Sequence, residues 1–267
     1  GLVEQARRVE LARTALELLP EDDHFARFFQ LRRILFISGG DPEVLGELFA
    51  TAEAAELWPE MAAVLQQLAC QQQDNEARIA LLGDLAKVYE EQLDKPTLAY
   101  LIHQAALLSP EHRDKVLEDL ERLARATGRH EDLLAILDRM TTVEFDLAER
   151  KAVLSRRAAI CEKDIEDPLR AFHEHRRRLE LDGDDWTPIE ELKRLAAAHQ
   201  LWRQLDAVFA ELMDRAGGDS QRLELLSRRE SVSREHLEDQ ARAFDFLVQR
   251  YRLDDGDLDL LRALTQD

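Results

Sequence analysis

Five arginines recur at fixed spacing, and their guanidinium groups could bind carboxylates. Arg78, Arg150 and Arg222 are separated by one constant period (150 − 78 = 72 and 222 − 150 = 72), and Arg157 and Arg229 each follow seven positions after the last two. Side chains seven positions apart lie on one stripe of a helix, so stacked helices would bring these guanidiniums into a ladder. A planar guanidinium can hold a carboxylate through two hydrogen bonds.

Two interpretations of this ladder stay open. In the first, it faces a groove and binds an acidic side chain or C-terminal carboxylate of a partner. In the second, it pairs internally with Glu and Asp of adjacent helices.

The sequence gives little support to a metal site or a catalytic nucleophile. His173 and His175 are two apart, on different sides of a helix, so we expect them to face solvent rather than bind a metal. Cys161 has no histidine base nearby in the sequence, which argues against a nucleophile. We therefore predict no catalytic residues, no metal and no cofactor, and hence no enzyme.

The amino-acid composition excludes some classes of binding partner. The 267 residues carry 55 Asp and Glu against 36 Lys and Arg, a net charge of -19, which repels nucleic acid and anionic lipid. No apolar run approaches the roughly 20 residues of a membrane span. Cys70 and Cys161 lie within helical patterns and are expected to be reduced core thiols, which favours a cytoplasmic protein. These features predict a protein or peptide partner, no nucleic acid and no membrane insertion.

The elements that position the arginines repeat with the same period of 72. Columns at this spacing keep their chemistry, as in a column of small residues (Ala99, Ala171, Ala243) and an aromatic column (Phe28, Tyr100, Phe172, Phe244). Apolar residues at i, i+3, i+4 and i+7 predict amphipathic helices. Each repeat holds two helix hairpins, and neighbouring hairpins must stack to bury their apolar faces. The chain 1–267 is therefore predicted to be a single all-α solenoid of about fifteen helices.

One repeat shows the expected boundaries, with helices at 78–93, 96–109, 113–127 and 130–141. Pro96 and Pro168 suit a first helical turn, and Asp94 and Asp167 could cap the free N–H groups there. Gly128 suits a left-handed residue at a helix end.

The hairpins resemble the tetratricopeptide repeat (TPR) family. Leu98-Ala99-Tyr100, followed by Ala106-Leu107-Leu108-Ser109-Pro110, and Arg170-Ala171-Phe172 look like that family's small residue, aromatic and Leu-rich exit. The doublet period is also similar to very long arrays in bacterial motility and scaffold proteins. The resemblance implies a protein–protein interaction scaffold that binds its partner in the solenoid groove. Alternatives are a ligand- or peptide-sensing regulatory repeat domain and, less well supported, an α/α-toroid enzyme.

The last predicted helix has an apolar face formed by Leu258, Leu260, Leu261 and Leu264. Natural arrays end in polar caps. We therefore interpret the chain as a fragment of a longer array and expect possible end-to-end self-association.

Overall fold

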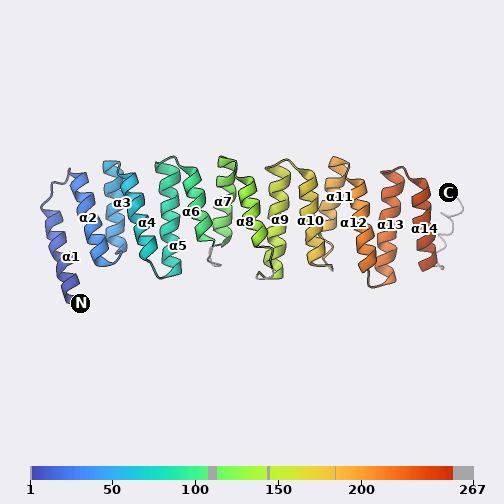
Figure 1. Cartoon of the computed structure of the whole chain (residues 1–267), viewed down its shortest axis with the longest axis horizontal. Helices are drawn as coiled ribbons and strands as arrows, with labels where there is room; N and C mark the ends of the chain where they lie inside the picture. Colours follow the sequence, from blue (N-terminus) through green and yellow to red (C-terminus); the bar gives the residue numbers. More distant parts are fainter. Residues whose placement is uncertain (1, 108–112, 143–144, 184, 255–267) are drawn as a thin grey trace. The chain divides into compact units, whose positions relative to one another are not determined.

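The computed structural model describes residues 2–107, 113–142, 145–183 and 185–254, and in these ranges the chain is all-α (Figure 1). The chain divides into two compact units, residues 1–129 and 130–267. The first unit contains α1 (Leu2–Glu17), α2 (His24–Ser38), α3 (Pro42–Ala55), α4 (Trp58–Gln71), α5 (Asn75–Lys87), the π-helical turn η1 (Val88–Gln92), α6 (Pro96–Ala106) and α7 (Arg113–Thr127). The second contains α8 (His130–Arg139), α9 (Leu147–Lys163), α10 (Pro168–Leu181), α11 (Pro188–His199), α12 (Trp202–Arg215), α13 (Asp219–Glu235) and α14 (Gln240–Leu253).

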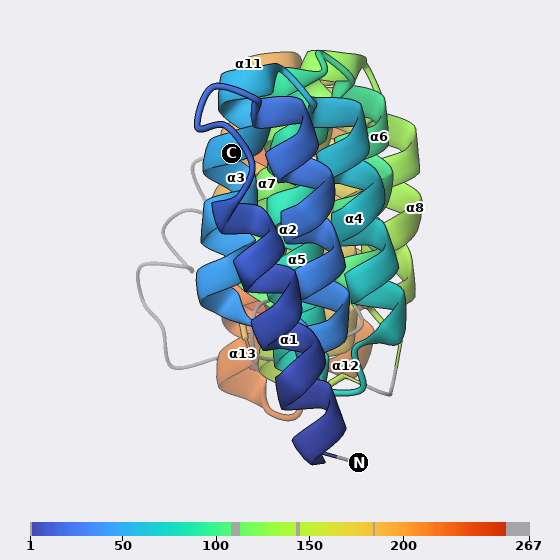
Figure 2. The ribbon, with the colours of Figure 1, turned by 90° about the vertical axis from the view of Figure 1, so that its left-hand side faces the viewer.

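Within each unit every helix packs against its neighbours in the chain, and several next-but-one helices are joined by ion pairs. Odd-numbered helices pair with one another, as Glu90 of η1 does with Arg122 of α7. Even-numbered helices do the same, as Arg176 of α10 does with Glu211 of α12. The helices of a unit therefore form an odd and an even layer. Figure 2 shows this in the first unit, where α3 lies on the side opposite α4 and α6.

The core follows the small and aromatic columns, except at Phe244, which is 39% exposed. Ala99, Tyr100, Ala171 and Phe172 are each no more than 1% exposed, in the second helices of their hairpins. A small residue beside a large ring lets two helices approach closely while the ring fills the space between them. The all-α prediction from helical periodicity is confirmed, and helix ends lie within a few residues of those expected.

The turns within three hairpins, those that lead into α6, α10 and α14, share one backbone conformation. Asp94, Glu166 and Glu238 have φ of 50°, 59° and 54°, and they are spaced by the repeat period (166 − 94 = 72 and 238 − 166 = 72). Each turn has the same two hydrogen bonds; in one of them the Leu93, Ile165 or Leu237 N–H bonds the carbonyl five residues back. These bonds satisfy carbonyls that a helix end would leave unpaired.

One predicted cap is confirmed and one is wrong. The Asp167 carboxylate accepts a hydrogen bond from the Arg170 N–H at 3.0 Å and so caps α10. Asp94 is the left-handed residue of its turn, and the cap position of α6 is taken by Lys95, which makes no side-chain cap. The reason is register, because Lys95 and not Asp94 is one period before Asp167 (167 − 95 = 72).

Two predictions stay open. The apolar helix containing Leu258, Leu260, Leu261 and Leu264 lies outside the described residues, as does the association that it implied. The division at residue 129 leaves the single continuous domain a prediction. None of the described helices is long and apolar enough to span a bilayer.

The left-handed turn residues give a stability prediction. Gly128 and Gln200 end α7 and α11 with φ of 68° and 57°. Left-handed backbone strains a side chain but not glycine, so Gly128→Ala is expected to destabilise by about 1 kcal/mol and Gln200→Gly to stabilise by up to about 1 kcal/mol. Thermal unfolding followed by circular dichroism measures both, and equal shifts in the same direction would contradict the explanation.

Candidate interaction groove

The buried members of the arginine column face the even layer. Arg157 on α9 is 7% exposed, and its Nε and Nη2 donate to the Glu174 carboxylate of α10 at 2.9 and 2.7 Å. Its Nη1 donates to the Leu134 carbonyl of α8 and lies 3.6 Å from Asp138. Arg157 thus joins three helices, because a buried guanidinium must have its donors satisfied.

Arg229 has a similar place on α13. Its Nε donates to the Asp206 carboxylate of α12 at 2.8 Å, and Arg242 of α14 donates to the other oxygen at 2.7 Å. Asp206 is 3% exposed, so two cations compensate one buried carboxylate. The Arg229 guanidinium also lies 4.3 Å from the centroid of the Phe246 ring, a favourable cation–π contact.

The other three arginines make local contacts near helix starts. Arg78 donates to Asn75 at 2.6 Å, Arg150 donates to the Thr141 carbonyl at 2.9 Å, and Arg222 lies 3.6 Å from Asp219. Arg157 and Arg229 thus have internal carboxylate partners, and a binding role for the column stays a prediction.

Arg157 gives a second prediction. Arg157→Ala leaves the Glu174 carboxylate buried without its cation, so the free energy of unfolding should fall by about 3 kcal/mol. Arg222→Ala, which removes an exposed contact, should change it by less than about 0.5 kcal/mol. Urea unfolding of both variants measures the difference, and equal effects would show that burial does not govern the pair.

Two sequence interpretations are wrong. His175 is 7% exposed, whereas His173 is exposed as expected. The signal for His175 was its column, because it follows the buried His103 by one period (175 − 103 = 72). Cys70 is exposed and is not a core thiol. Cys161 is buried, and burial raises the pKa of its thiol, which keeps it protonated and unreactive. Across the part of the chain that the structure describes, no group of three metal-binding side chains occurs.

The first unit has a groove between α5 and α7, with α6 as its floor. The hollow has a volume of about 440 Å³. Its apolar lining is Ile79, Ala80, Gly83, Ala106 and Val116. A Cβ on Gly83 would meet no heavy atom within 4 Å, so α5 presents bare backbone to open space there.

In the second unit the equivalent space, one repeat later, is occupied. Arg178 takes the place of Ala106 and Ser155 the place of Gly83. Arg178 donates to the Ser155 hydroxyl of α9 at 3.1 Å and to the Thr187 hydroxyl that precedes α11 at 2.9 Å. One long side chain from α10 therefore fills the gap between α9 and α11, and small residues leave the α5–α7 gap open.

The mouth of the groove is crossed by an ion pair. Arg122 of α7 donates both Nη atoms to the Glu90 carboxylate of η1, one at 2.9 Å, and also contacts Asp119 at 3.2 Å. These hydrogen bonds raise the pKa of Arg122. In the second unit Arg194 binds Glu162 with two bonds of 2.7 Å, and both partners are at the equivalent positions one repeat later. The pair fixes the spacing of neighbouring odd helices.

The rest of the rim is mainly acidic. Glu76, Asp84 and Glu91 line the groove, and among the described residues only Asp84 of these three has a cation close by, with Lys87 at 3.8 Å. Lys115 is the remaining charged residue of the lining. The groove thus combines an apolar floor with more carboxylates than cations.

His103 lies on the floor and is 8% exposed. Burial lowers its pKa, and Arg122 and Lys87 act in the same direction, while Asp119 and Glu90 oppose them. The imidazole is therefore neutral at pH 7, and it can hydrogen-bond without carrying charge.

This shift gives a pH prediction. Below about pH 6.5 the unfolded chain binds a proton on His103 that the folded chain does not, so stability should fall as the pH drops. His103→Gln removes this contribution, and its unfolding midpoint should fall less than that of the wild type between about pH 7.5 and 5.5. Urea unfolding at the two values tests it; identical slopes would contradict a desolvated histidine.

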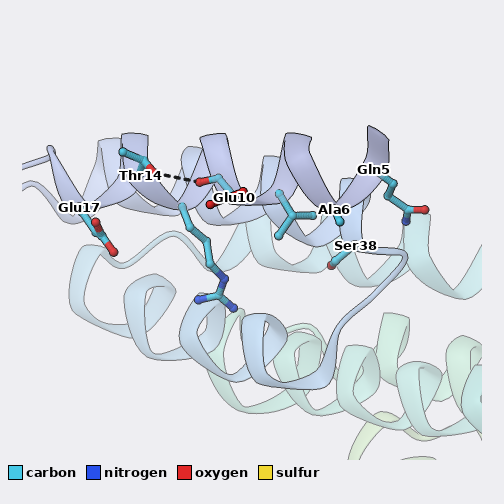
Figure 3. Close-up of a pocket in the computed structure, with 8 residues that line it drawn as sticks. Gln5, Ala6, Glu10, Thr14, Glu17 and Ser38 are labelled. Carbon is cyan, nitrogen blue, oxygen red and sulfur yellow. Dashed lines mark hydrogen bonds between the residues drawn. The ribbon is translucent and has the colours of Figure 1, made fainter. Parts of the chain in front are cut away.

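A second hollow, of about 850 Å³, runs along α1 (Figure 3). Except for Ser38 its lining comes from that one helix, and much of it is polar, including Gln5, Glu10 and Glu17. The Thr14 hydroxyl donates to the Glu10 carbonyl within α1 at 3.0 Å. Because its lining comes almost entirely from one helix, this hollow offers less to a ligand than the α5–α7 groove.

Helix hairpins with Ala99, Tyr100, Ala171 and Phe172 buried in their second helices are the arrangement of a helical repeat. No protein-family model matches the chain, and no curated protein matches it. Among solved structures, it is similar to the C-terminal part of a TPR repeat-containing protein from Cytophaga hutchinsonii, with 11% identity, 96% of this chain and 99% of that chain covered, and a TM-score of 0.38.

Two further structures are similar at this level. Pseudomonas aeruginosa pilF has 17% identity, covers 84% of this chain and 97% of its own, and gives a TM-score of 0.33. The TPR2AB domain of yeast Sti1, in a complex with pHSP90, has 12% identity, covers 100% and 97%, and also gives 0.33. TM-scores this low carry no information about the function of this chain.

Proposed function

We propose that the chain is a protein-interaction scaffold that holds a segment of a partner protein in the groove between α5 and α7. The supporting observation is that small residues keep this groove open, whereas Arg178 fills the equivalent space of the second unit. A concave apolar floor with polar groups around it is the usual form of a binding site.

The lining defines the chemistry of the segment. An aliphatic side chain fits over Ile79, Gly83 and Val116, where no polar atom needs a partner. The excess of rim carboxylates favours a Lys or Arg beside it, and the neutral His103 can bond its backbone or a hydroxyl.

Gly83→Leu tests this proposal without harming the fold. The new side chain enters open space and blocks the groove, and replacing glycine within a helix stabilises that helix by about 1 kcal/mol. Peptides selected from a random library against the full chain should bind Gly83→Leu at least about tenfold more weakly than wild type, by fluorescence anisotropy.

The matched control is Gly46→Leu. Gly46 is also a helical glycine with no atom within 4 Å of an added Cβ, but it lies on α3 and does not line the groove. Its affinity should equal that of wild type, and both variants should melt at or above the wild-type temperature. Selected peptides that bind Gly83→Leu as tightly as wild type would refute the groove as the binding site.

A further inference from the structure

Aromatic and cationic side chains share one stripe of α2, which is exposed at Phe25, Phe29 and Arg33, whereas Phe36 is partly buried against the core. Phe25, Phe29, Arg32, Arg33 and Phe36 are spaced at i, i+4, i+7, i+8 and i+11, which places them within about 100° of one another around the helix. We name these five residues the α2 stripe. Phe25 is 60% exposed and Phe29 38%.

The exposed rings are held in place from below. Phe28 is fully buried, the Phe29 ring packs edge-on against it at 5.5 Å, and the Phe25 ring lies 4.8 Å from that of Phe29. Aromatic surface that is already ordered loses little entropy when a partner covers it. Exposed apolar groups arranged in this way are typical of interaction sites.

The arginines of the α2 stripe make no ion pair within the described part of the chain. Among the described residues, no carboxylate lies within salt-bridge distance of Arg32 or Arg33, and α2 itself contains no acidic residue. Two guanidiniums beside exposed rings can therefore accept carboxylates from outside the chain.

The equivalent arginines two repeats later are neutralised. Arg176 and Arg177 of α10 follow Arg32 and Arg33 by two periods (176 − 32 = 144). Arg176 pairs with Glu180 at 3.1 Å and with Glu211 at 3.0 Å, and Arg177 pairs with Glu174 and Asp138, both at 3.1 Å.

Three of these four carboxylates have an equivalent position in the first repeat, and none of the three is acidic there. The positions of Glu174, Glu180 and Glu211 are occupied by Gln30, Phe36 and Gln67. Gln30 is engaged elsewhere, since its amide donates to the Ala12 carbonyl of α1 at 2.8 Å. At these three positions the first repeat has the arginine pair without the acids, and one acid is replaced by an aromatic ring.

We propose that the α2 stripe is a docking surface for an acidic segment of a partner protein that also carries apolar side chains. Its carboxylates bind Arg32 and Arg33, and its apolar groups cover Phe25 and Phe29. None of the five residues lines the α5–α7 groove, so this surface is separate from the groove of the proposed function.

Charge favours a protein segment over other anionic partners. A membrane surface or a nucleic acid would face the net charge of -19 over a wide area, and repulsion would oppose binding. A short acidic segment meets only the local field of α2, which is cationic.

The probe is a labelled peptide made only of Glu, Asp, Leu and Phe, with a second peptide in which Lys replaces every acid. Anisotropy with the full chain should show binding of the acidic peptide, weakening as salt is added, and any binding of the Lys peptide should be unchanged by substitutions in the α2 stripe. Phe25→Ser with Phe29→Ser, and separately Arg32→Gln with Arg33→Gln, should each weaken the acidic peptide at least about tenfold.

The matched control is Arg176→Gln with Arg177→Gln, which alters the same positions two repeats on and should leave the affinity unchanged. Gly83→Leu should also leave it unchanged, which separates this surface from the groove. Because the altered side chains of the stripe are at the surface, unchanged melting temperatures should accompany the loss of binding.

Three results would overturn the proposal. The first is equal affinity of the stripe variants and wild type for the acidic peptide. The second is stripe-dependent binding to phosphatidylserine vesicles without binding of the peptide, which would assign the surface to a membrane. The third is stripe-dependent dimerisation in sedimentation velocity without binding of the peptide, which would assign it to a second copy of the chain.

Discussion

An amphipathic helix hairpin cannot cover its own apolar surface, and the structure of each unit depends on this constraint. Two helices joined by a short turn bury only the side on which they meet, so a neighbouring hairpin must cover the rest. The constraint does not restrict the type of residue at surface positions that make no contact between helices. It also explains why the most regular columns are the small and aromatic ones, such as Ala99 and Tyr100, which lie where helices touch.

Charged residues divide into two groups under this constraint. Some lie in the contacts between helices. Arg157 joins α8, α9 and α10, and Asp206 accepts hydrogen bonds from Arg229 and Arg242. Others stay at the surface, where the identity of a single residue decides whether a gap is filled. Ala106 and Arg178 are at equivalent positions, and one leaves a groove while the other closes it. The same fold can therefore have an open or a filled gap between odd helices, depending on single residues.

Much of the fold could be predicted from the sequence, because helical periodicity and turn residues act locally. The α7 boundaries 113–127 and the left-handed Gly128 agree with the prediction. Asp94 differs because cap and turn positions are adjacent, and only the alignment with Asp167 and Lys95 separates them. Helical periodicity also gave the stripe on which Arg157 lies but not whether that stripe faces a groove or the even layer, since this depends on contacts between helices.

The two surfaces proposed to bind partners were harder to predict, because each is defined by side chains that are small or absent. The groove depends on the small size of Gly83 and Ala106, and the α2 stripe on the lack of acids around Arg32 and Arg33. The signal in both cases is a departure from the column, Ala106 against Arg178 and Gln30 against Glu174. In a repeat protein, equivalent positions can be compared within one chain. A position whose residue differs from its equivalents shows where the fold alone does not dictate the residue.

The Arg–Glu pairs between odd helices have a mechanical consequence. Glu90 with Arg122, and Glu162 with Arg194, join next-but-one helices through side chains that are partly exposed. Exposed ion pairs weaken as salt screens them, whereas the apolar contacts between adjacent helices do not. The helices of each unit are therefore held together by two kinds of contact. The ion pairs between next-but-one helices are sensitive to ionic strength, and the apolar contacts between adjacent helices are not. The stiffness of a unit against bending along its stack is therefore set in part by the surrounding electrolyte.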